Sequence, residues 1–258
     1  MVGNLGKFFW ITVSEFGDFT LFLFRTVAGV IGSRRLMRRV WRAIYEQGVL
    51  CLPVVVIVGL FTGLVLGLQG YYVLNRFGSE TLLGALVSLS LTREMAPVLA
   101  ALVLVGQAGS ALAAELGIQR NSEQILALET MGVNSYGYLV TPRILSALVV
   151  FPMQTAIFVI VGLWGGWISG SWILGLDAGV YWSSIEKAIE MRDVRESFLK
   201  AAVFGFLCIG VCAHQGYNAH RCGLRGAKAV SFSTTRAVVV SSVLILATDY
   251  VITSFLIS

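Results

Sequence analysis

The chain has 258 residues, of which 57% are hydrophobic and only 13% carry a charge, and its mean hydropathy is +0.81. A soluble domain has about 45–50% apolar and about 25% charged residues, so this composition excludes a soluble protein and indicates an integral membrane one. The net charge of +5 fits basic loops and contact with anionic lipid better than a nucleic-acid site. The four cysteines lie mostly in or next to apolar runs and indicate no disulfide framework.

Residues 1–48 are predicted to lie along the membrane surface before the first crossing. Residues 7–31 combine many aromatic side chains with Lys7, Glu15, Asp18 and Arg25, a mixture typical of an interfacial helix. The first thirty residues have neither a basic start nor a small-residue cleavage site, and Glu15 and Asp18 interrupt their apolar run, so we expect no cleaved signal peptide. Five arginines then follow within residues 34–42, and such a cluster beside an apolar run marks the cytoplasmic side.

Five apolar segments predict an all-α bundle over residues 49–257, within a single domain of residues 1–258. The second segment would be about 50 Å long as a helix, against a hydrocarbon core of about 30 Å, so it either protrudes or breaks near Pro97. We also expect a solvated helix within residues 176–197 and a Gly-rich basic loop over residues 214–236. The predicted spans are residues 49–74, 82–114, 144–170, 198–213 and 237–257.

Basic residues are distributed unequally between the two sides of this bundle. The side of the N-terminal segment carries eleven: Arg34, Arg35, Arg38, Arg39, Arg42, Arg120, Arg143, Arg221, Arg225, Lys228 and Arg236. The other side carries four: Arg76, Lys187, Arg192 and Arg195. The positive-inside rule therefore places the N-terminus and the loop after the second span in the cytoplasm, and the C-terminus outside.

Glycines recur every fourth residue in two of the predicted spans. Gly59, Gly63 and Gly67 lie in the first span, and the third span repeats the spacing at Gly162, Gly166 and Gly170. Such stripes allow two helices to approach closely. We expect them to pack helices, within one chain or between two copies.

Four ionisable residues fall inside or at the edge of apolar spans: Arg93, Glu94, Lys200 and Asp249. Charges at this depth are costly and are usually paired inside a bundle or beside a wet cavity. The first three lie near the outer ends of their spans, and Asp249 lies about 13 Å from the C-terminal end of its helix. We expect the four to meet, either as a salt-bridged lock between helices or as the polar part of a cavity for an amphipathic ligand.

Residues 115–132 form a polar stretch between the second and third spans. We expect Asn121 to cap a helix of about ten residues, with Glu123 in its first turn and Gly132 at its end. At about 15 Å it is too short to cross a bilayer, so it lies at the surface. It either docks a partner or serves as an ordinary interfacial connector.

No pattern of catalytic or metal-binding residues stands out. Cys208, Cys212, His214, His220 and Cys222 match no zinc spacing, and the two cysteines of the fourth span are interpreted as small apolar residues. Neither a nucleophile elbow, nor H-E-x-x-H, nor a phosphate-binding loop G-x-x-x-x-G-K-[ST] occurs. We expect no catalytic site, and any ATP would be hydrolysed by another chain.

Residues 115–143 read ELGIQRNSEQILALETMGVNSYGYLVTPR. Their succession of E-L-G, E-Q-I-x-A-L, Met-Gly and Y-L-V-x-P-R resembles the MlaE/YrbE permeases, the membrane subunits of ABC lipid transporters that work with MCE-domain proteins. The resemblance covers nearly all of the chain after residue 40. It continues through LTREMAPVLAAL (residues 91–102), FLKAAVFG (198–205), QGYNA (215–219) and TTRAVVVSSVLILATDY (234–250).

The resemblance implies a homodimeric permease in the bacterial inner membrane that moves phospholipid between the inner and outer membranes of a Gram-negative envelope. Its implied partners are a cytoplasmic ABC ATPase dimer that binds ATP and Mg, a periplasmic MCE hexamer and a small STAS-type accessory subunit. Residues 115–132 would be the coupling helix that docks on the ATPase. The docking residues would be Glu115, Arg120, Glu123, Ile125, Leu128, Glu129 and Met131.

Within this reading the first and second spans line a lipid cavity at the dimer seam. Arg93 and Glu94, with Lys200 and Asp249, would form its polar edge. Two rival functions use the same residues differently: a proton-coupled secondary transporter with Glu94, Lys200 and Asp249 as a relay, and a membrane scaffold without a bound lipid. The residues expected to contact acyl chains are Leu66, Leu68, Tyr71, Tyr72 and Leu74.

Overall fold

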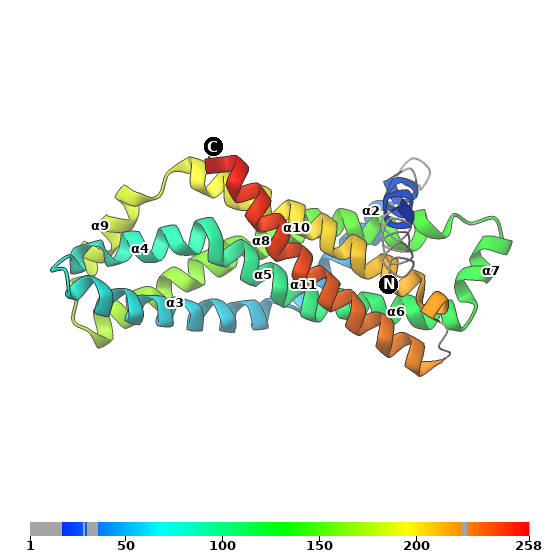
Figure 1. Cartoon of the computed structure of the whole chain (residues 1–258), viewed down its shortest axis with the longest axis horizontal. Helices are drawn as coiled ribbons and strands as arrows, with labels where there is room; N and C mark the ends of the chain where they lie inside the picture. The colour runs from blue at the N-terminus through cyan, green and yellow to red at the C-terminus, as the bar shows by residue number, and fades with distance from the viewer. Residues whose placement is uncertain (1–16, 28, 30–35, 223–225, 258) are drawn as a thin grey trace, which may run out of the picture.

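The computed structural model describes residues 17–27, 29, 36–222 and 226–257, and every regular element in these ranges is a helix. The long helices run side by side along one axis, and the C-terminal helix crosses the others obliquely (Figure 1). The predicted all-α class is confirmed.

Five helical segments within the described ranges are long and apolar enough to cross a bilayer, as predicted. The first comprises α2 (Leu36–Ile44) and α3 (Leu52–Asn75), and the second α4 (Leu83–Ser90), α5 (Ala96–Leu104) and α6 (Ser110–Asn121). The other three contain α8 (Thr141–Trp167), α10 (Met191–Tyr217) and α11 (Ala227–Ile257). Two shorter helices connect spans, α7 (Gln124–Thr130) and α9 (Ala178–Ala188), and they lie at opposite ends of the bundle (Figure 1).

Residues 17–27 are helical and lie across the long axis of the bundle (Figure 1). Phe22 of this helix is buried and packs edge-on against the rings of Tyr136 and Tyr217. The hydroxyl of Thr141 donates to the carbonyl of Thr26 at 2.8 Å. The segment is therefore attached where α8 begins. The rest of the predicted interfacial segment before residue 17, together with Arg34 and Arg35, lies outside the described residues.

Pro97 does not break the second span, which is helical from Glu80 to Asn121. Proline lacks an amide hydrogen and crowds the carbonyl four residues earlier, here that of Arg93. The segment Leu91–Met95 is a wider π-helical turn that accommodates this crowding, and α5 continues with Pro97 in its first turn. At 42 residues the span is about 63 Å long, so it protrudes from the hydrocarbon core.

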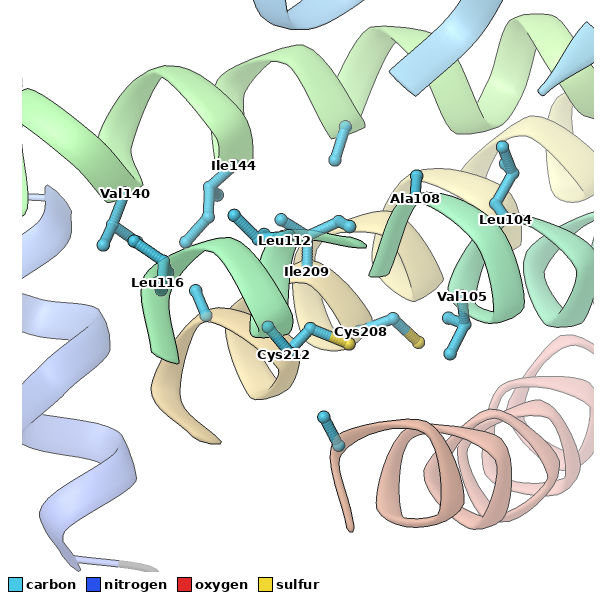
Figure 2. Close-up of a cluster of buried hydrophobic side chains, with 14 of the residues drawn as sticks. Leu104, Val105, Ala108, Leu112, Leu116, Val140, Ile144, Cys208, Ile209 and Cys212 are labelled. Atoms are coloured by element: carbon cyan, nitrogen blue, oxygen red, sulfur yellow. The ribbon is translucent and has the colours of Figure 1, made fainter. Parts of the chain in front are cut away.

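The buried apolar residues form two clusters along the bundle. The larger one lies between α6, α8 and α10, where Leu112, Leu116, Ile144 and Ile209 point toward one another (Figure 2). The second joins α3, α4 and α9 to the far half of α8 and includes Leu83, Phe158 and Tyr181. Cys208 and Cys212 belong to the larger cluster as small buried side chains.

The glycines of the first span pack against α8 of the same chain. A Cβ atom on Gly63 would collide with the carbonyl oxygen of Gly162, and one on Gly59 would lie 3.2 Å from that of Phe158. Gly67 faces the side chain of Ser169 in the same manner. This stripe is therefore covered within the chain. In the third span, Gly166 of α8 faces the Tyr181 hydroxyl and Gly170, just after α8, faces Leu83, so the second stripe also packs internally.

Two predicted connections differ from the structure. The expected loop 214–236 is largely helical, because α10 continues to Tyr217 and α11 already begins at Ala227. The hydroxyls of Thr234 and Thr235 donate to carbonyls one turn earlier, which satisfies these polar side chains within the helix. Packing against α6 then holds the turn, since Gly117 faces Val230.

The expected solvated helix of residues 176–197 is in fact α9 followed by the first turns of α10. Its apolar face is packed, because Tyr181 is fully buried and Ile185 nearly so. The hydroxyl of Tyr181 donates to the carbonyl of Leu163 at 3.1 Å, and burial raises the pKa of this phenol. The prediction rested on the charged residues of this segment and did not use the four-residue spacing that places Tyr181 and Ile185 on one apolar face of α9.

Candidate functional site

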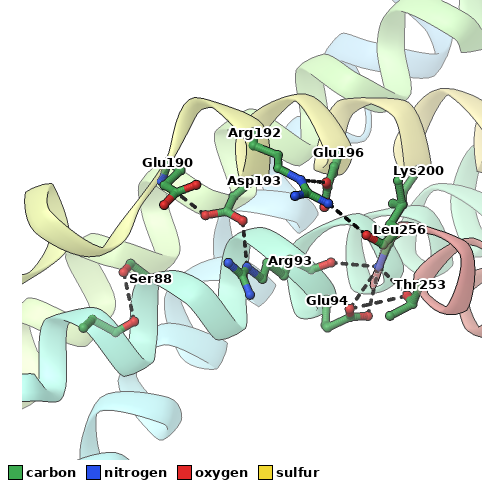
Figure 3. A network of polar contacts seen from close by, with 11 residues as sticks. Ser88, Arg93, Glu94, Glu190, Arg192, Asp193, Glu196, Lys200, Thr253 and Leu256 are labelled. Carbon is green, nitrogen blue, oxygen red and sulfur yellow. Dashed lines mark hydrogen bonds and ion pairs between the residues drawn. The ribbon is translucent and has the colours of Figure 1, made fainter. Parts of the chain in front are cut away.

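Lys200 of α10 is the centre of a polar cluster near the C-terminal turns of α11. Its side chain is only 3% exposed, and its ammonium forms ion pairs with Glu94 at 3.0 Å and with Asp249 at 3.2 Å. It also donates to Thr253 Oγ1 at 2.7 Å. Side chains from the second and fifth spans thus meet around one buried cation of the fourth. Figure 3 shows the contacts of Lys200 with Glu94 and Thr253.

The fourth contact of Lys200 is with a backbone carbonyl of the second span. Its ammonium donates to the carbonyl oxygen of Arg93 at 3.0 Å. This is the carbonyl that Pro97 leaves without a helical partner, because residue 97 has no amide hydrogen. Lys200 therefore satisfies a backbone acceptor as well as two carboxylates.

Arg93 directs its guanidinium away from Lys200. Its Nε pairs with Asp193 at 2.7 Å, and Asp193 is in turn fixed because its other oxygen accepts from the backbone N–H of Glu190 at 3.2 Å, in the capping box that starts α10. Asp193 is 4% exposed, whereas the side chain of Arg93 is 54% exposed. The guanidinium is therefore anchored on one edge and open on the other.

A cavity of about 260 Å³ opens between these side chains. It is small for an entire ligand, since ligand pockets usually measure about 300–1,000 Å³, and it suits a polar group of a larger molecule. Sequence reasoning missed Asp193 and Thr253; the E-x-x-D capping box at residues 190–193 was the available signal for the former. The lining consists of Arg93, Glu94, Glu190, Arg192, Asp193, Glu196, Lys200, Thr253 and Leu256.

The five residues of α3 expected to contact acyl chains lie on two different faces. Leu66, Tyr71 and Leu74 are half-buried and pack against the second apolar cluster. Leu68 and Tyr72 are exposed, one turn apart on the outer face of the helix. These two offer more surface to a ligand outside the chain than the other three, because the glycine stripe of α3 determines which face packs inward.

The start of the central helix differs from the prediction. Asn121 is the last residue of α6, and its side-chain amide donates to the carbonyl of Gly226 at 3.5 Å, so its expected capping role is wrong. The N-cap of α7 is Glu123, which has φ of +57° and makes no side-chain capping bond. Gly132 has φ of +74° and ends the helix as predicted. The helix has seven residues, because α6 uses the preceding ones.

Several residues expected to dock on a partner are engaged inside the chain. Ile125 is fully buried and Leu128 packs against the larger apolar cluster, so neither presents its side chain to a partner in this conformation. Glu115 pairs with Arg143 at 2.5 Å. The Nε of Arg120 donates to Nδ1 of His220 at 3.3 Å.

Glu129 fastens α7 to the rest of the bundle. Its Oε1 accepts from the hydroxyl of Tyr217 at 2.7 Å and from that of Ser135 at 3.0 Å. These hydrogen bonds, the one from Tyr217 above all, hold the pKa of Glu129 below its ordinary value. The short helix is therefore held by Ile125 and Glu129 together.

The α7 region, here residues 118–131, has an exposed face that carries Glu123 and Met131 from the predicted set. It also carries two apolar residues that the prediction missed, Ile118 and Leu126. The prediction placed Ile125, Leu128 and Met131 on one apolar face of the helix and assigned that face to the partner. Leu126 was not included, because a short helix between two spans has apolar residues on both sides and their period alone does not identify the exposed face.

Five apolar helices long enough to cross a bilayer define a multi-pass membrane protein, with an ionic cluster between its spans and a short connecting helix after the second. Residues 40–255 match the Permease MlaE family, and the chain belongs to that family.

Curated relatives align over most of the chain. A probable ABC transporter permease protein of Rickettsia conorii is 38% identical over 237 residues, 92% of this chain and 90% of the relative. The intermembrane phospholipid transport system permease protein MlaE of Haemophilus influenzae is 35% identical over 235 residues, 91% of this chain and 88% of the relative. The chloroplastic protein TRIGALACTOSYLDIACYLGLYCEROL 1 of Arabidopsis thaliana is 30% identical over 234 residues, 89% of this chain and 66% of that protein.

Proposed function

We propose that the chain is the permease subunit of an ABC transporter that moves phospholipids between the inner and outer membranes of a bacterial envelope. The observation that carries this proposal is the similarity, over 91% of this chain, to a relative named as an intermembrane phospholipid transport system permease. The cavity around Arg93 supports it, because an open guanidinium next to apolar helices fits a ligand with a charged head and greasy chains.

In this proposal Arg93 binds the phosphate of the lipid. Asp193 holds the Nε edge of its guanidinium, and Arg93 lines the cavity with a half-exposed side chain. The acyl chains then lie against exposed apolar residues of α3, including Leu68 and Tyr72. Each buried CH₂ contributes about 0.8 kcal/mol, so a two-chain lipid is held strongly and its release requires an energy source.

We further propose that the α7 region docks on a cytoplasmic ATPase, which binds the ATP and Mg. Its exposed residues Ile118, Glu123, Leu126 and Met131 form the contact surface. Glu129 conveys the movement to α10 through Tyr217, since the two side chains are hydrogen-bonded. The same proposal includes a homodimer, a periplasmic MCE hexamer and a small STAS-type accessory subunit.

The rival function as a proton-coupled transporter would use Glu94, Lys200 and Asp249 as a relay. Membership of a permease family with ABC transporter relatives does not favour it. Lys200 is also engaged with four partners, which suits a lock between spans that keeps the cavity in shape. We therefore assign Lys200 and Asp249 to positioning, and Arg93 with Glu94 to the edge of the binding site.

Lipid transfer by the complex purified from native membranes and reconstituted in vesicles tests this assignment. Arg93→Gln should lower phospholipid transfer about tenfold, because it removes a charge-assisted hydrogen bond to phosphate. Glu94→Ala should lower transfer while leaving the complex assembled. Arg195→Gln is the matched control, an exposed arginine of α10 outside the cavity, and should transfer at the normal rate.

Native mass spectrometry of the same preparations gives the second readout. Two copies of the chain with an ATPase and bound phospholipid support the proposal. A bare monomer under several gentle conditions contradicts it. If Glu94→Ala prevents assembly, the cluster is a structural lock and the proposed role of Glu94 at the binding site fails.

A further inference from the structure

A second polar cavity lies far from the cluster around Lys200. Its volume is about 510 Å³, and it is lined by α2, by the end of the second span and by the start of the third. Glu115 on its wall follows Glu94 by 21 residues along the second span, or about 30 Å of helix. The cavity is therefore near the opposite end of the bundle, and the transport path proposed above does not include it.

The charges on this cavity do not cancel. Its lining includes the three arginines Arg39, Arg42 and Arg143 and the two glutamates Glu46 and Glu115. Arg42 pairs with Glu46 at 2.8 Å, and Arg143 pairs with Glu115 at 2.5 Å. Within the described part of the chain, Arg39 makes no ion pair, so the cavity keeps one net positive charge.

Arg39 is held in a defined orientation without a carboxylate. Its guanidinium carbon lies 3.7 Å from the centre of the Tyr138 ring, at the wall of the cavity. Stacking on an aromatic face fixes the plane of a guanidinium and leaves its edge N–H groups free. Two such N–H groups match two oxygens of a phosphate.

The surroundings place the cavity at the level of lipid headgroups. Arg143 directly precedes the apolar run of α8. Met37 and Trp41 of α2 and Tyr45, which directly follows α2, are spaced by four residues, and all three are exposed, Met37 and Trp41 by more than 70%. Tryptophan and tyrosine concentrate at membrane interfaces, and arginine beside an apolar run attracts anionic lipid.

We propose that this cavity binds the phosphodiester headgroup of an anionic phospholipid from the adjacent leaflet, with Arg39 as the principal donor. One phosphodiester carries one negative charge, which matches the uncompensated charge of the cavity. The acyl chains of this lipid lie along Met37, Trp41 and Tyr45. It is a resident lipid that ties α2 to the start of α8, distinct from the lipid that is transported.

Photocrosslinking tests the site in the purified full complex, placed in nanodiscs of phosphatidylcholine with a trace of photoactivatable phosphatidylglycerol. Arg39→Gln should reduce crosslinks within residues 36–46 and 138–143 about tenfold, because a charge-assisted hydrogen bond is lost. Arg38→Gln removes the same charge from an exposed neighbour outside the cavity and should leave them unchanged. Arg39→Lys keeps the charge but lacks the guanidinium that lies over the Tyr138 ring, and it should give an intermediate yield of crosslinks.

Three outcomes overturn the proposal. Equal losses in Arg38→Gln and Arg39→Gln mean that general charge attraction suffices. A yield of crosslinks as high in Arg39→Lys as in the unmodified chain means that the guanidinium stacked on Tyr138 has no role. If Arg39→Gln does not fold, Arg39→Lys decides whether Arg39 is the principal donor. Displacement of the lipid by millimolar inorganic phosphate or glycerophosphoglycerol means that the ligand is a soluble phosphate compound. Lipid transfer is measured separately, so the fate of the transport proposal is distinguishable.

Discussion

Lys200 and Pro97 show how two residues 103 positions apart depend on each other. A proline inside a membrane helix leaves a carbonyl without its amide partner, and such groups need another donor in the absence of water. The buried ammonium of Lys200 is that donor, and it also pairs with Glu94 and Asp249. A charge that is costly in a membrane is thus matched by two carboxylates and a backbone carbonyl.

The hydrogen bond from Tyr217 to Glu129 predicts how the stability of the chain depends on pH. The pKa of Glu129 is lowered in the folded chain, so the stabilisation that Glu129 provides is complete above the ordinary value, near pH 4.3, and is lost as the pH falls through the lowered one. Tyr217→Phe removes the main hydrogen bond. Its thermal midpoint should therefore lie below that of the unmodified chain at pH 7, and the gap should narrow toward pH 3.

Midpoints of the purified complex over this pH range provide the measurement. Tyr250→Phe is the control, since that tyrosine is highly exposed and its change should have no effect at any pH. A gap for Tyr217→Phe that stays constant from pH 7 to pH 3 would show that the hydroxyl stabilises the chain through a contact that does not depend on the charge of Glu129, such as the one with the hydroxyl of Ser135.

At the scale of elements, the contact between α3 and α8 determines how the first half of the bundle is arranged. Gly59, Gly63 and Gly67 form the flat face of α3, and the backbone of α8 fills it. Because this face is buried, the remaining side chains of α3 are divided into half-buried Leu66, Tyr71 and Leu74 and an outward face. The glycine spacing thus decides which residues reach lipid.

Gly63→Ala tests this contact. The added methyl group would collide with the Gly162 carbonyl, and overpacking of this kind costs about 1–3 kcal/mol. We expect a lower thermal midpoint of the purified complex and a smaller yield from membranes. Gly106→Ala is the matched control, because a Cβ there meets no atom within 4 Å and alanine favours a helix. Equal midpoints for the two variants would contradict close packing at Gly63.

At the scale of the whole molecule, the bundle has two chemically different ends. α9 lies at one end and α7 at the other (Figure 1). The polar cavity around Lys200 and the arginine-lined cavity are separated along the second span, and the arginine-lined one is nearer to α7 in sequence, at Glu115 and Gln119. The excess of basic residues at the α7 end predicts that this end faces the cytoplasm.

Cysteine labelling tests this orientation, in a chain in which Cys222 is replaced by serine; the other three cysteines are buried. In cells with a permeabilised outer membrane, a membrane-impermeant maleimide should label Asn75→Cys at the end of α3. It should reach Ser122→Cys, between α6 and α7, only after lysis. Both positions are exposed, so each serves as the accessibility control for the other. Labelling in the reverse order contradicts the predicted orientation.

The sequence was sufficient wherever a property depends on composition or on neighbouring residues. Five crossings follow from runs of apolar residues, and the end of α7 follows from Gly132, because only a residue that accepts positive φ suits that position. The family was also recognisable, since residues 115–143 carry a long local pattern and the match extends over residues 40–255. The meeting of Glu94, Lys200 and Asp249 was predictable from depth, because unpaired charges are too costly in a bilayer.

Tertiary structure decided which partner each residue takes. Arg93 pairs with Asp193 because the capping box of α10 holds that carboxylate near it. Asn121 does not cap α7 because it is the last residue of α6. Ile125 and Leu126 are neighbours of similar hydrophobicity, yet one is buried and the other exposed. In a chain that is apolar nearly throughout, hydrophobicity does not distinguish inside from outside; the shapes of the packed faces make that distinction, and they exist only once the helices have met.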